Sequence, residues 1–402
     1  MKKLLLFILA IPVLFSATAQ QNYWNPYSGT GKISTDKSVA RVSFPKTFKL
    51  FTANLPLLKQ ELFKVVNNSV AHTHIISLPN ADGAMEEFEV VEASNFDAEL
   101  QAQFPEIRAF SGKGITDKYA TLKMSYSPQG IQTMVFRTGK ENEFIEPYSQ
   151  DHSIYAVFKS QRSKTQLPWK CTTPGADLEL SINTQVQNSG ITDRSGGNLK
   201  TMRLAQSVTA EYSNYFGAPS SAQVALVLAA INNTLTRCNG VYEKDLALHL
   251  NLIAASTNVI YYNASTDPYS NAAQMGNWNT QLQNTLTSVI GEANYDIGHL
   301  FGASGGGGNA GCIGCVCVNG SKGSGITSPA DGVPAGDNFD IDYVVHEVGH
   351  QLGGIHTFSM SNDGSGVNKE VGSGITIMGY AGITSYDVAG HSYDIYHEAT
   401  IE

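Results

Sequence analysis

Three histidines at a fixed spacing constrain this chain more than any other feature of its sequence. If the chain is helical from His346, then His346 and His350 lie four residues apart on one helix face, where both imidazoles can reach one ion. Gly353 and Gly354 would end that helix and allow a reversal that brings His356 back to the same ion. Three neutral nitrogens leave a fourth position open for water, as catalytic zinc sites do. The spacing predicts one catalytic zinc ion.

The residue after the first histidine predicts what the zinc is used for. Glu347 would lie beside the activated water, where a carboxylate can act as general base. A helix with incidental histidines and a zinc site without activity are the alternatives, and the presence of Glu347 argues against the second. The sequence does not decide whether a structural calcium ion is also bound.

The first residues are typical of a bacterial export signal. Lys2 and Lys3 precede an apolar run over 4–15, and small residues at 17–19 supply a cleavage site. We therefore expect a signal peptide over 1–19 and a secreted protein. No later stretch approaches the ~20 apolar residues that a spanning helix needs, so no membrane span is expected.

Length and charge indicate two globular domains of different character. The chain has 402 residues, of which 42% are hydrophobic and 15% charged, enough for about two domains. Residues 1–195 hold 20 Lys and Arg against 18 Asp and Glu, whereas residues 196–402 hold 6 against 17. The acidic second half lacks the basic surface that nucleic acids require, so no nucleic-acid partner is expected. Its acidity is best explained by solubility.

The first domain is predicted to be β-rich and to span residues 20–187. Alternating apolar residues separated by short turns indicate hairpins. The expected strands are 73–78, 88–91, 121–126 and 131–136. A polar, glycine-rich stretch over 188–200, which contains Arg194, predicts an exposed linker and a site of activating cleavage.

The second domain is predicted to span residues 201–402 and to alternate strands with helices. This order indicates an α/β fold with a mostly parallel sheet and an active-site helix. We expect strands at 201–208, 246–252 and 295–301, and helices from 221 and around 282–290. The segment 302–336 is so rich in Gly, Ser and Asn that it is predicted to be too irregular for a core. Residues 391–402 indicate the entry to a last helix of which only a turn or two is present, so a truncated domain is expected.

The histidine string resembles a known family. It fits the metzincin pattern H-E-x-x-H-x-x-G-x-x-H, and Met378, 22 residues after His356, resembles the methionine of the Met-turn that packs beneath the zinc ligands. From about residue 201 the chain is similar to the reprolysin, or adamalysin-like, branch, including the segment 295–299. Residues 70–150 resemble the β-rich propeptides of bacterial members.

The resemblance implies a secreted zinc endopeptidase that is made as a zymogen, cuts internal bonds of extracellular proteins and is inhibited by its own propeptide. It also implies that the substrate lies extended along an edge formed by Gly308, Asn309, Ala310 and Gly311. In astacins and serralysins a tyrosine two residues after the Met-turn methionine helps to bind the metal and stabilise the transition state. Tyr380 stands at that offset, and simple packing is the alternative.

Two positions depart from the adamalysin pattern. Thr357 follows the third histidine where adamalysins place Asp, and Thr376 stands two residues before the Met-turn methionine where they place Cys. The superfamily is therefore better defined than the branch.

Five cysteines suggest a regulatory thiol. The second domain holds Cys238, Cys312, Cys315 and Cys317, which could close two disulfides in any of three pairings. Cys171 is then unpaired, and a thiolate can displace the water from a zinc ion. We expect Cys171 to cap the zinc in the precursor, as cysteine switches do. The alternatives are a buried free cysteine and a disulfide to the second domain.

The sequence also allows two other functions. A metzincin-fold protein without activity could be a binding or toxin-like protein, and a zinc hydrolase could act on substrates other than peptides. The sequence leaves open the substrate, the cleavage preference, the activating protease, the oligomeric state and any module beyond residue 402.

Overall fold

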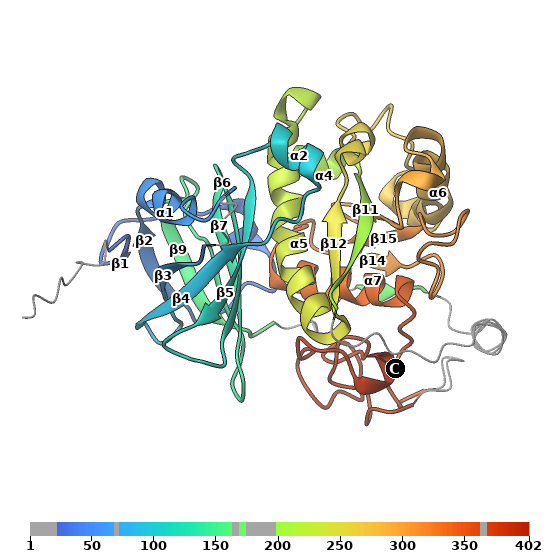
Figure 1. Ribbon diagram of the computed structural model, residues 1–402. Coiled ribbons are helices and arrows are strands. Elements are labelled where there is room, and N and C mark those ends of the chain that lie inside the picture. Colours follow the sequence, from blue (N-terminus) through green and yellow to red (C-terminus); the bar gives the residue numbers. More distant parts are fainter. Residues whose placement is uncertain (1–21, 68–71, 163–168, 174–197, 362–367, 402) are drawn as a thin grey trace, which may run out of the picture.

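The computed structural model describes residues 22–67, 72–162, 169–173, 198–361 and 368–401. The predicted signal peptide and most of the predicted linker, including Arg194, lie outside these residues. The described chain folds around two β-sheets, and helix α5 (Val224–Leu246) lies between them (Figure 1). In the described ranges, no helix is both long and apolar enough to cross a membrane.

The N-terminal sheet has nine strands, and each pair of neighbours is antiparallel, in the order β1-β2-β9-β8-β7-β6-β5-β4-β3. Alternate residues such as Phe88 and Val90 enter an apolar core. Both predicted hairpins are confirmed, because β3 pairs with β4 and β6 pairs with β7. The strands are β1 (Trp24–Pro26), β2 (Lys49–Ala53), β3 (His74–Pro79), β4 (Met85–Glu92), β5 (Arg108–Gly114), β6 (Thr121–Ser127), β7 (Gly130–Phe136), β8 (Glu143–Pro147) and β9 (Ile154–Lys159).

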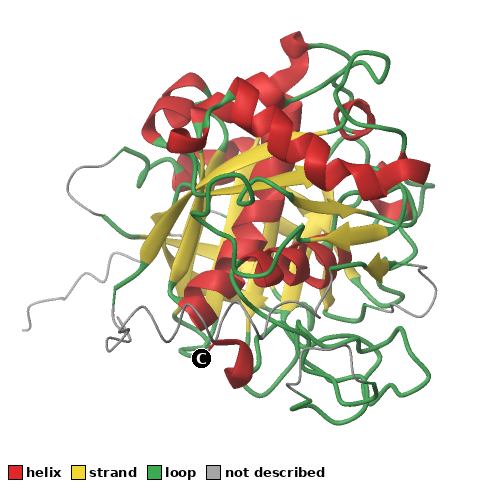
Figure 2. Cartoon of the chain, turned by 90° about the vertical axis from the view of Figure 1, so that its right-hand side faces the viewer, coloured by secondary structure: helices red, strands yellow, loops and turns green. Residues whose placement is uncertain are grey.

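The C-terminal sheet has six strands in the order β10-β14-β15-β13-β11-β12, and only the pair β14–β15 is antiparallel. Helix α5 covers one face and α6 (Trp278–Val289) the other (Figures 1 and 2). The predicted α/β domain with a mostly parallel sheet, preceded by a β-rich domain, is confirmed. The strands are β10 (Lys170–Cys171), β11 (Lys200–Val208), β12 (Leu248–Leu252), β13 (Ile297–Phe301), β14 (Gly307–Asn309) and β15 (Gly325–Ser328).

The remaining helices are short. Several begin at a polar side chain that accepts a hydrogen bond from the first turn, as Asp97 does from the amide of Leu100. They are η1 (Lys37–Ala40), α1 (Leu55–Leu62), α2 (Ala98–Gln103), α4 (Ala210–Tyr215), η2 (Ser221–Gln223), η3 (Ala254–Val259), η4 (Ala272–Asn277), η5 (Glu292–Asn294), η6 (Asn338–Val345), α7 (His346–Gln351) and α8 (Glu398–Ile401).

The prediction that the segment 302–336 is too irregular for a core is wrong. It contributes β14 and β15, and β15 is buried along its whole length. Its glycines hide the strand pattern because two of them leave room for the active-site helix. A Cβ on Gly308 would lie 2.3 Å from Glu347 Oε1, and a Cβ on Gly325 would lie 2.2 Å from Gln351 Oε1. Any side chain at either position would collide with the helix.

The start of one strand also differs from the prediction. The strand expected over 246–252 begins only at Leu248, because helix α5 continues to Leu246. Ala247 then reverses the chain with a left-handed backbone, φ 50°.

Helix α5 presents different surfaces to the two sheets. Leu228, Ile231 and Leu235 join a core that includes residues of β11 and β12 and also residues of the N-terminal sheet, such as those of β7, β8 and β9. Polar residues of the same helix meet the N-terminal sheet: Asn233 accepts a hydrogen bond from Ser125 at 2.6 Å, and Glu243 pairs with Lys123. The junction between the two halves is therefore partly polar.

Buried ion pairs also cross this junction. Arg162 donates to Asp342 at 2.8 Å and to Asp394 at 2.6 Å, and Arg41 pairs with Asp337 at 3.2 Å. Burial disfavours the guanidinium charge, but Asp342 and Asp394 raise the pKa of Arg162 above its ordinary value. Some of the acidity of the second half is thus matched by arginines of the first half.

Candidate metal centre

The segment that carries the metal ligands begins as a π-helix. Asn338–Val345 forms η6, every residue of which is buried, and it continues directly into α7 at His346. Helix α7 ends at Gln351, and Gly353 comes soon after it with φ 113°. This left-handed turn lets the chain reverse toward His356, as predicted from the two glycines. Short π-helical segments occur frequently at functional sites.

Backbone carbonyls orient two of the histidines. His346 Nδ1 lies 2.7 Å from the carbonyl oxygen of Ile377, and His350 Nδ1 lies 2.7 Å from that of Gly354. A carbonyl oxygen can only accept a hydrogen bond, so both Nδ1 atoms carry the proton. In the neutral ring each Nε2 atom then carries no hydrogen and is suited to bind a metal ion.

The structure brings Cys171 together with the three histidines. One ligand atom from each of Cys171, His346, His350 and His356 lies within 4.8 Å of the other three, and all four residues are buried. His350 Nε2 lies 3.1 Å from His356 Nε2 and 3.6 Å from Cys171 Sγ. Tetrahedral zinc with ordinary bond lengths requires nitrogen–nitrogen and nitrogen–sulfur separations of about 3.3 and 3.6 Å. The donor set and these two separations fit zinc.

Glu347 is enclosed beside this group. Burial raises the pKa of the Glu347 carboxyl to about 8. The Thr173 hydroxyl donates to its Oε2 atom at 2.9 Å and itself accepts the amide proton of Ala310 at 2.8 Å. A carboxyl that changes protonation near neutral pH is suited to accept and return a proton.

The predicted substrate edge is covered by the chain itself. Strand β10 pairs with β14 in parallel register, and the Thr172 amide donates to the carbonyl of Gly308 at 2.9 Å. Asn309 donates from its side chain to the Thr172 carbonyl at 2.9 Å. Ala310 binds Thr173 as described above, and Gly311 turns the chain away with φ 74°.

Met378 and Tyr380 both lie against the metal centre. A Cβ on Gly349, in the middle of α7, would lie 2.8 Å from Met378 Sδ, so the methionine packs directly against the helix backbone. The Tyr380 ring meets His356 edge to face at 4.7 Å and lies 4.8 Å from Phe358, centroid to centroid. Met378 therefore lies where the resemblance expects it, and Tyr380 lies beside a metal ligand.

One carboxylate connects the two positions that depart from the adamalysin pattern. Glu370 accepts hydrogen bonds from the hydroxyls of both Thr357 and Thr376, the latter at 2.6 Å. It also accepts from the backbone amides of Ile375 and Thr376 at 2.9 and 3.0 Å. The residue after the third histidine is thereby tied to the turn that contains Met378.

Three residues of the site escaped the sequence analysis: Trp169, Thr173 and Glu370. Trp169 and Thr173 stand two residues before and after Cys171, and this i±2 spacing on an extended segment could have indicated a shared face. The sequence gives no such signal for Glu370, because its hydrogen-bond partners Thr376 and Thr357 lie six and thirteen residues away along the chain.

Of the two disulfides that the four cysteines of the second domain could close, the structure forms one. In the described chain Cys312 and Cys315 form the single disulfide. Cys238 is buried in α5, where its thiol donates to the carbonyl of Asp340 at 3.4 Å, and Cys317 is exposed. Cys171 is unpaired with any cysteine, as expected.

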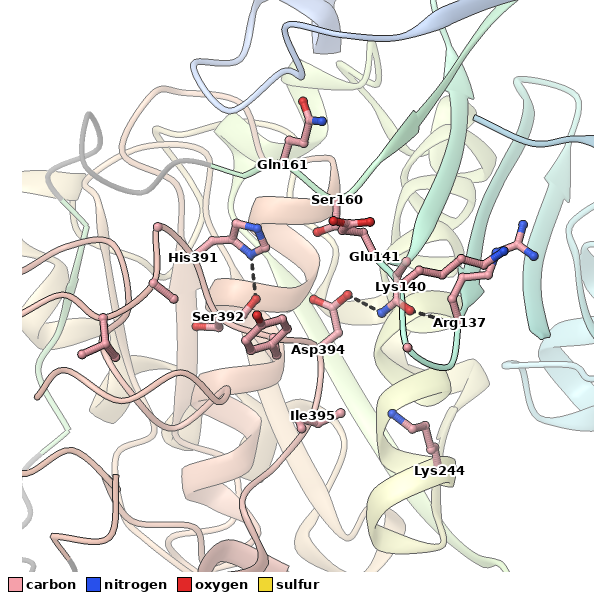
Figure 3. Close-up of a pocket in the computed structure, with 16 residues that line it drawn as sticks. Arg137, Lys140, Glu141, Ser160, Gln161, Lys244, His391, Ser392, Asp394 and Ile395 are labelled. Carbon is pink, nitrogen blue, oxygen red and sulfur yellow. Dashed lines mark hydrogen bonds between the residues drawn. The ribbon is translucent and has the colours of Figure 1, made fainter. Parts of the chain in front are cut away.

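A cavity of about 860 Å³ lies elsewhere, at the junction of the two halves. Figure 3 shows Lys140 and Glu141 of the first half facing His391 and Asp394 of the second across it. Asn142 donates to Asp394 at 2.6 Å on its wall. None of the four metal-centre residues lines this cavity.

The fold and the site together indicate a metallopeptidase domain in which three histidines and Cys171 of the preceding half form a buried candidate metal site, consistent with zinc. Residues 198–395 match the profile of the metallopeptidase family M12B, reprolysin-like. This part of the chain belongs to that family, in agreement with the resemblance found in the sequence. A comparison with curated proteins finds no match.

Proposed function

We propose that the chain is the secreted precursor of a zinc endopeptidase that hydrolyses internal peptide bonds of extracellular proteins. One observation carries this proposal: three histidine nitrogens and the Cys171 sulfur converge within 4.8 Å of one another, with the buried Glu347 in the same helix. Membership of a metallopeptidase family supports protein substrates. The export signal predicted over 1–19 supports secretion.

The chain's own residues supply binding, orientation and proton transfer. His346, His350 and His356 would hold zinc, which when bound activates water and polarises the scissile carbonyl. Glu347 accepts the proton from the attacking water and returns it to the leaving amine. The free edge of β14 would align the substrate backbone once β10 has left it.

Three contacts would keep the precursor inactive. Cys171 would hold the coordination position that the attacking water needs. The Thr173 hydroxyl binds the Glu347 carboxylate, and β10 pairs with the edge of β14. Burial raises the pKa of the Cys171 thiol and the Glu347 carboxylate raises it further, so a thiolate here requires a cation beside it.

Release of the first half would require a cut between β10 and β11. The predicted linker over 188–200 lies in this interval, and strand β11 begins at Lys200. Part of the surface that α5 turns toward the N-terminal sheet is polar and tolerates water. The two halves also share an apolar core that includes Phe136 and Phe144, and separation would expose these side chains.

The test uses zinc-loaded full-length protein and a mixture of denatured proteins as substrate. Uncut wild type should be silent, uncut Cys171→Ala should cleave, and Cys171→Ala/Thr173→Val should cleave faster. Glu347→Ala should retain zinc without cleaving. If uncut Cys171→Ala is as silent as wild type, Cys171 is not the latch. If zinc-loaded, cut wild type cleaves no protein, the chain is a binding protein or a hydrolase of other substrates.

A further inference from the structure

Trp169 occupies a niche beside the metal centre. Its indole stacks on the Tyr343 ring with 4.5 Å between centroids and 4° between planes, and it meets His346 edge to face at 5.7 Å. Only 6% of the residue is exposed, and among the residues that the structure describes its Nε1 atom has no hydrogen-bond partner. The contacts that the niche makes with the indole are therefore contacts with the face and edge of its ring.

The position of the niche follows from the geometry of an extended chain. Trp169, Cys171 and Thr173 are buried, whereas Lys170 and Thr172 between them are exposed. Alternate residues of a strand share a face and lie about 6.6 Å apart. A chain along β14 that places one residue at the metal thus places the next residue of that face on Tyr343.

Tyr343 belongs to the second half and would stay with it when the first half leaves. It belongs to η6, which is continuous with the helix that carries His346 and His350. Withdrawal of residues 169–173 would uncover the ring face on which Trp169 now lies. We propose that this face is the floor of a subsite that selects an aromatic substrate side chain within two residues of the cleaved bond. The inference rests on the proposed function, because it takes the substrate to be a peptide bound along β14.

The first experiment needs no catalysis. Trp169→Gly in the full-length chain empties the niche, and indole is the probe. Indole should raise the thermal midpoint of Trp169→Gly but not that of wild type, and the effect should disappear in Trp169→Gly/Tyr343→Leu. Equal stabilisation of the single and double variants, or none in either, would overturn the proposal.

The second experiment measures specificity and serves also if Trp169→Gly fails to fold. The activated protein should cut a peptide library about three- to tenfold faster where an aromatic residue lies within two positions of the bond, the size of one stacking contact. Tyr343→Phe should keep this preference and Tyr343→Leu should lose it, with zinc content measured in each. Cleavage without aromatic preference, or its persistence in Tyr343→Leu, would overturn the subsite while the proposed function stands. Absence of all cleavage would refute the proposed function, and the indole experiment would still decide whether the niche selects aromatic rings.

Discussion

Both halves of the chain bury apolar and charged side chains, but among the described residues only the second half buries histidines. The N-terminal sheet encloses an apolar core of residues such as Phe88, Phe110 and Leu122. The region around the metal centre buries histidines and carboxylates, and two of these carboxylates, Asp342 and Asp394, meet an arginine of the first half. Apolar burial needs no specific partner, whereas a buried charge is tolerated only when it is paired.

The second half depends on the first for part of its charge pairing. Arg41 and Arg162 supply positive charge to the segment that leads into the metal-binding helix. The same half also supplies Cys171 and Thr173 to the metal centre. One part of the chain therefore both completes the ion pairs of the second half and closes its site.

The largest expected effect is a loss of zinc binding, which should follow substitution of a histidine in the second half but not of one in the first. His350→Ala should abolish stoichiometric zinc binding and reduce cleavage at least about a thousandfold, because it removes a ligand whose orientation is fixed by Gly354. Zinc content per chain, measured by atomic absorption, is the readout. The exposed His72 of the first half is the control, and His72→Ala should keep its zinc. Full zinc content in His350→Ala would disprove the ligand assignment.

Removal of a junction arginine should cost several kcal/mol of stability. Arg162→Met leaves Asp342 and Asp394 buried without their partner, so the free energy of unfolding should fall by about 3–5 kcal/mol. Urea titration of the full-length protein measures this change. Lys159→Met, which breaks a solvent-screened pair with Asp82, should change the free energy of unfolding far less than Arg162→Met does. Equal losses in the two variants would contradict the role given to the junction.

Acidification should destabilise the second half, because that half buries a neutral histidine. His299 contacts Gln351 and Thr327 at 2.7 and 2.8 Å, and burial lowers the pKa of His299 to about 4. Because the unfolded chain binds this proton near pH 6.5, stability should decrease by about 3 kcal/mol as the pH falls from 6.5 to 4. Urea titrations across this range should show a smaller decrease in His299→Gln. The same slope in both proteins would assign the pH dependence to other groups.

The smallest effect concerns Tyr380. Removal of its hydroxyl in Tyr380→Phe should leave the ring contacts with His356 and Phe358 intact. If the hydroxyl stabilises the transition state, turnover by the activated enzyme should fall about 10- to 100-fold with little change in KM. Steady-state kinetics on one peptide would show this. An unchanged turnover number would leave Tyr380 with a packing role only.

The sequence alone determined the features that depend on neighbouring residues. Histidines spaced four and six residues apart, with two glycines between the second and third, define a helix, a reversal and a common ion because helix geometry and backbone freedom are local properties. The hairpins and the alternation of strands with helices followed from periodicity for the same reason.

Only the tertiary structure decided how distant segments complete one another. The glycines at 308 and 325 conceal strands because they make room for Glu347 and Gln351, which lie more than twenty residues further along the chain. Trp169 and Thr173 gain their roles from β10 pairing with β14, and Glu370 gains its role from Thr357 and Thr376. Such contacts depend on packing between elements, and periodicity can indicate a shared face but does not identify the partner on the other element.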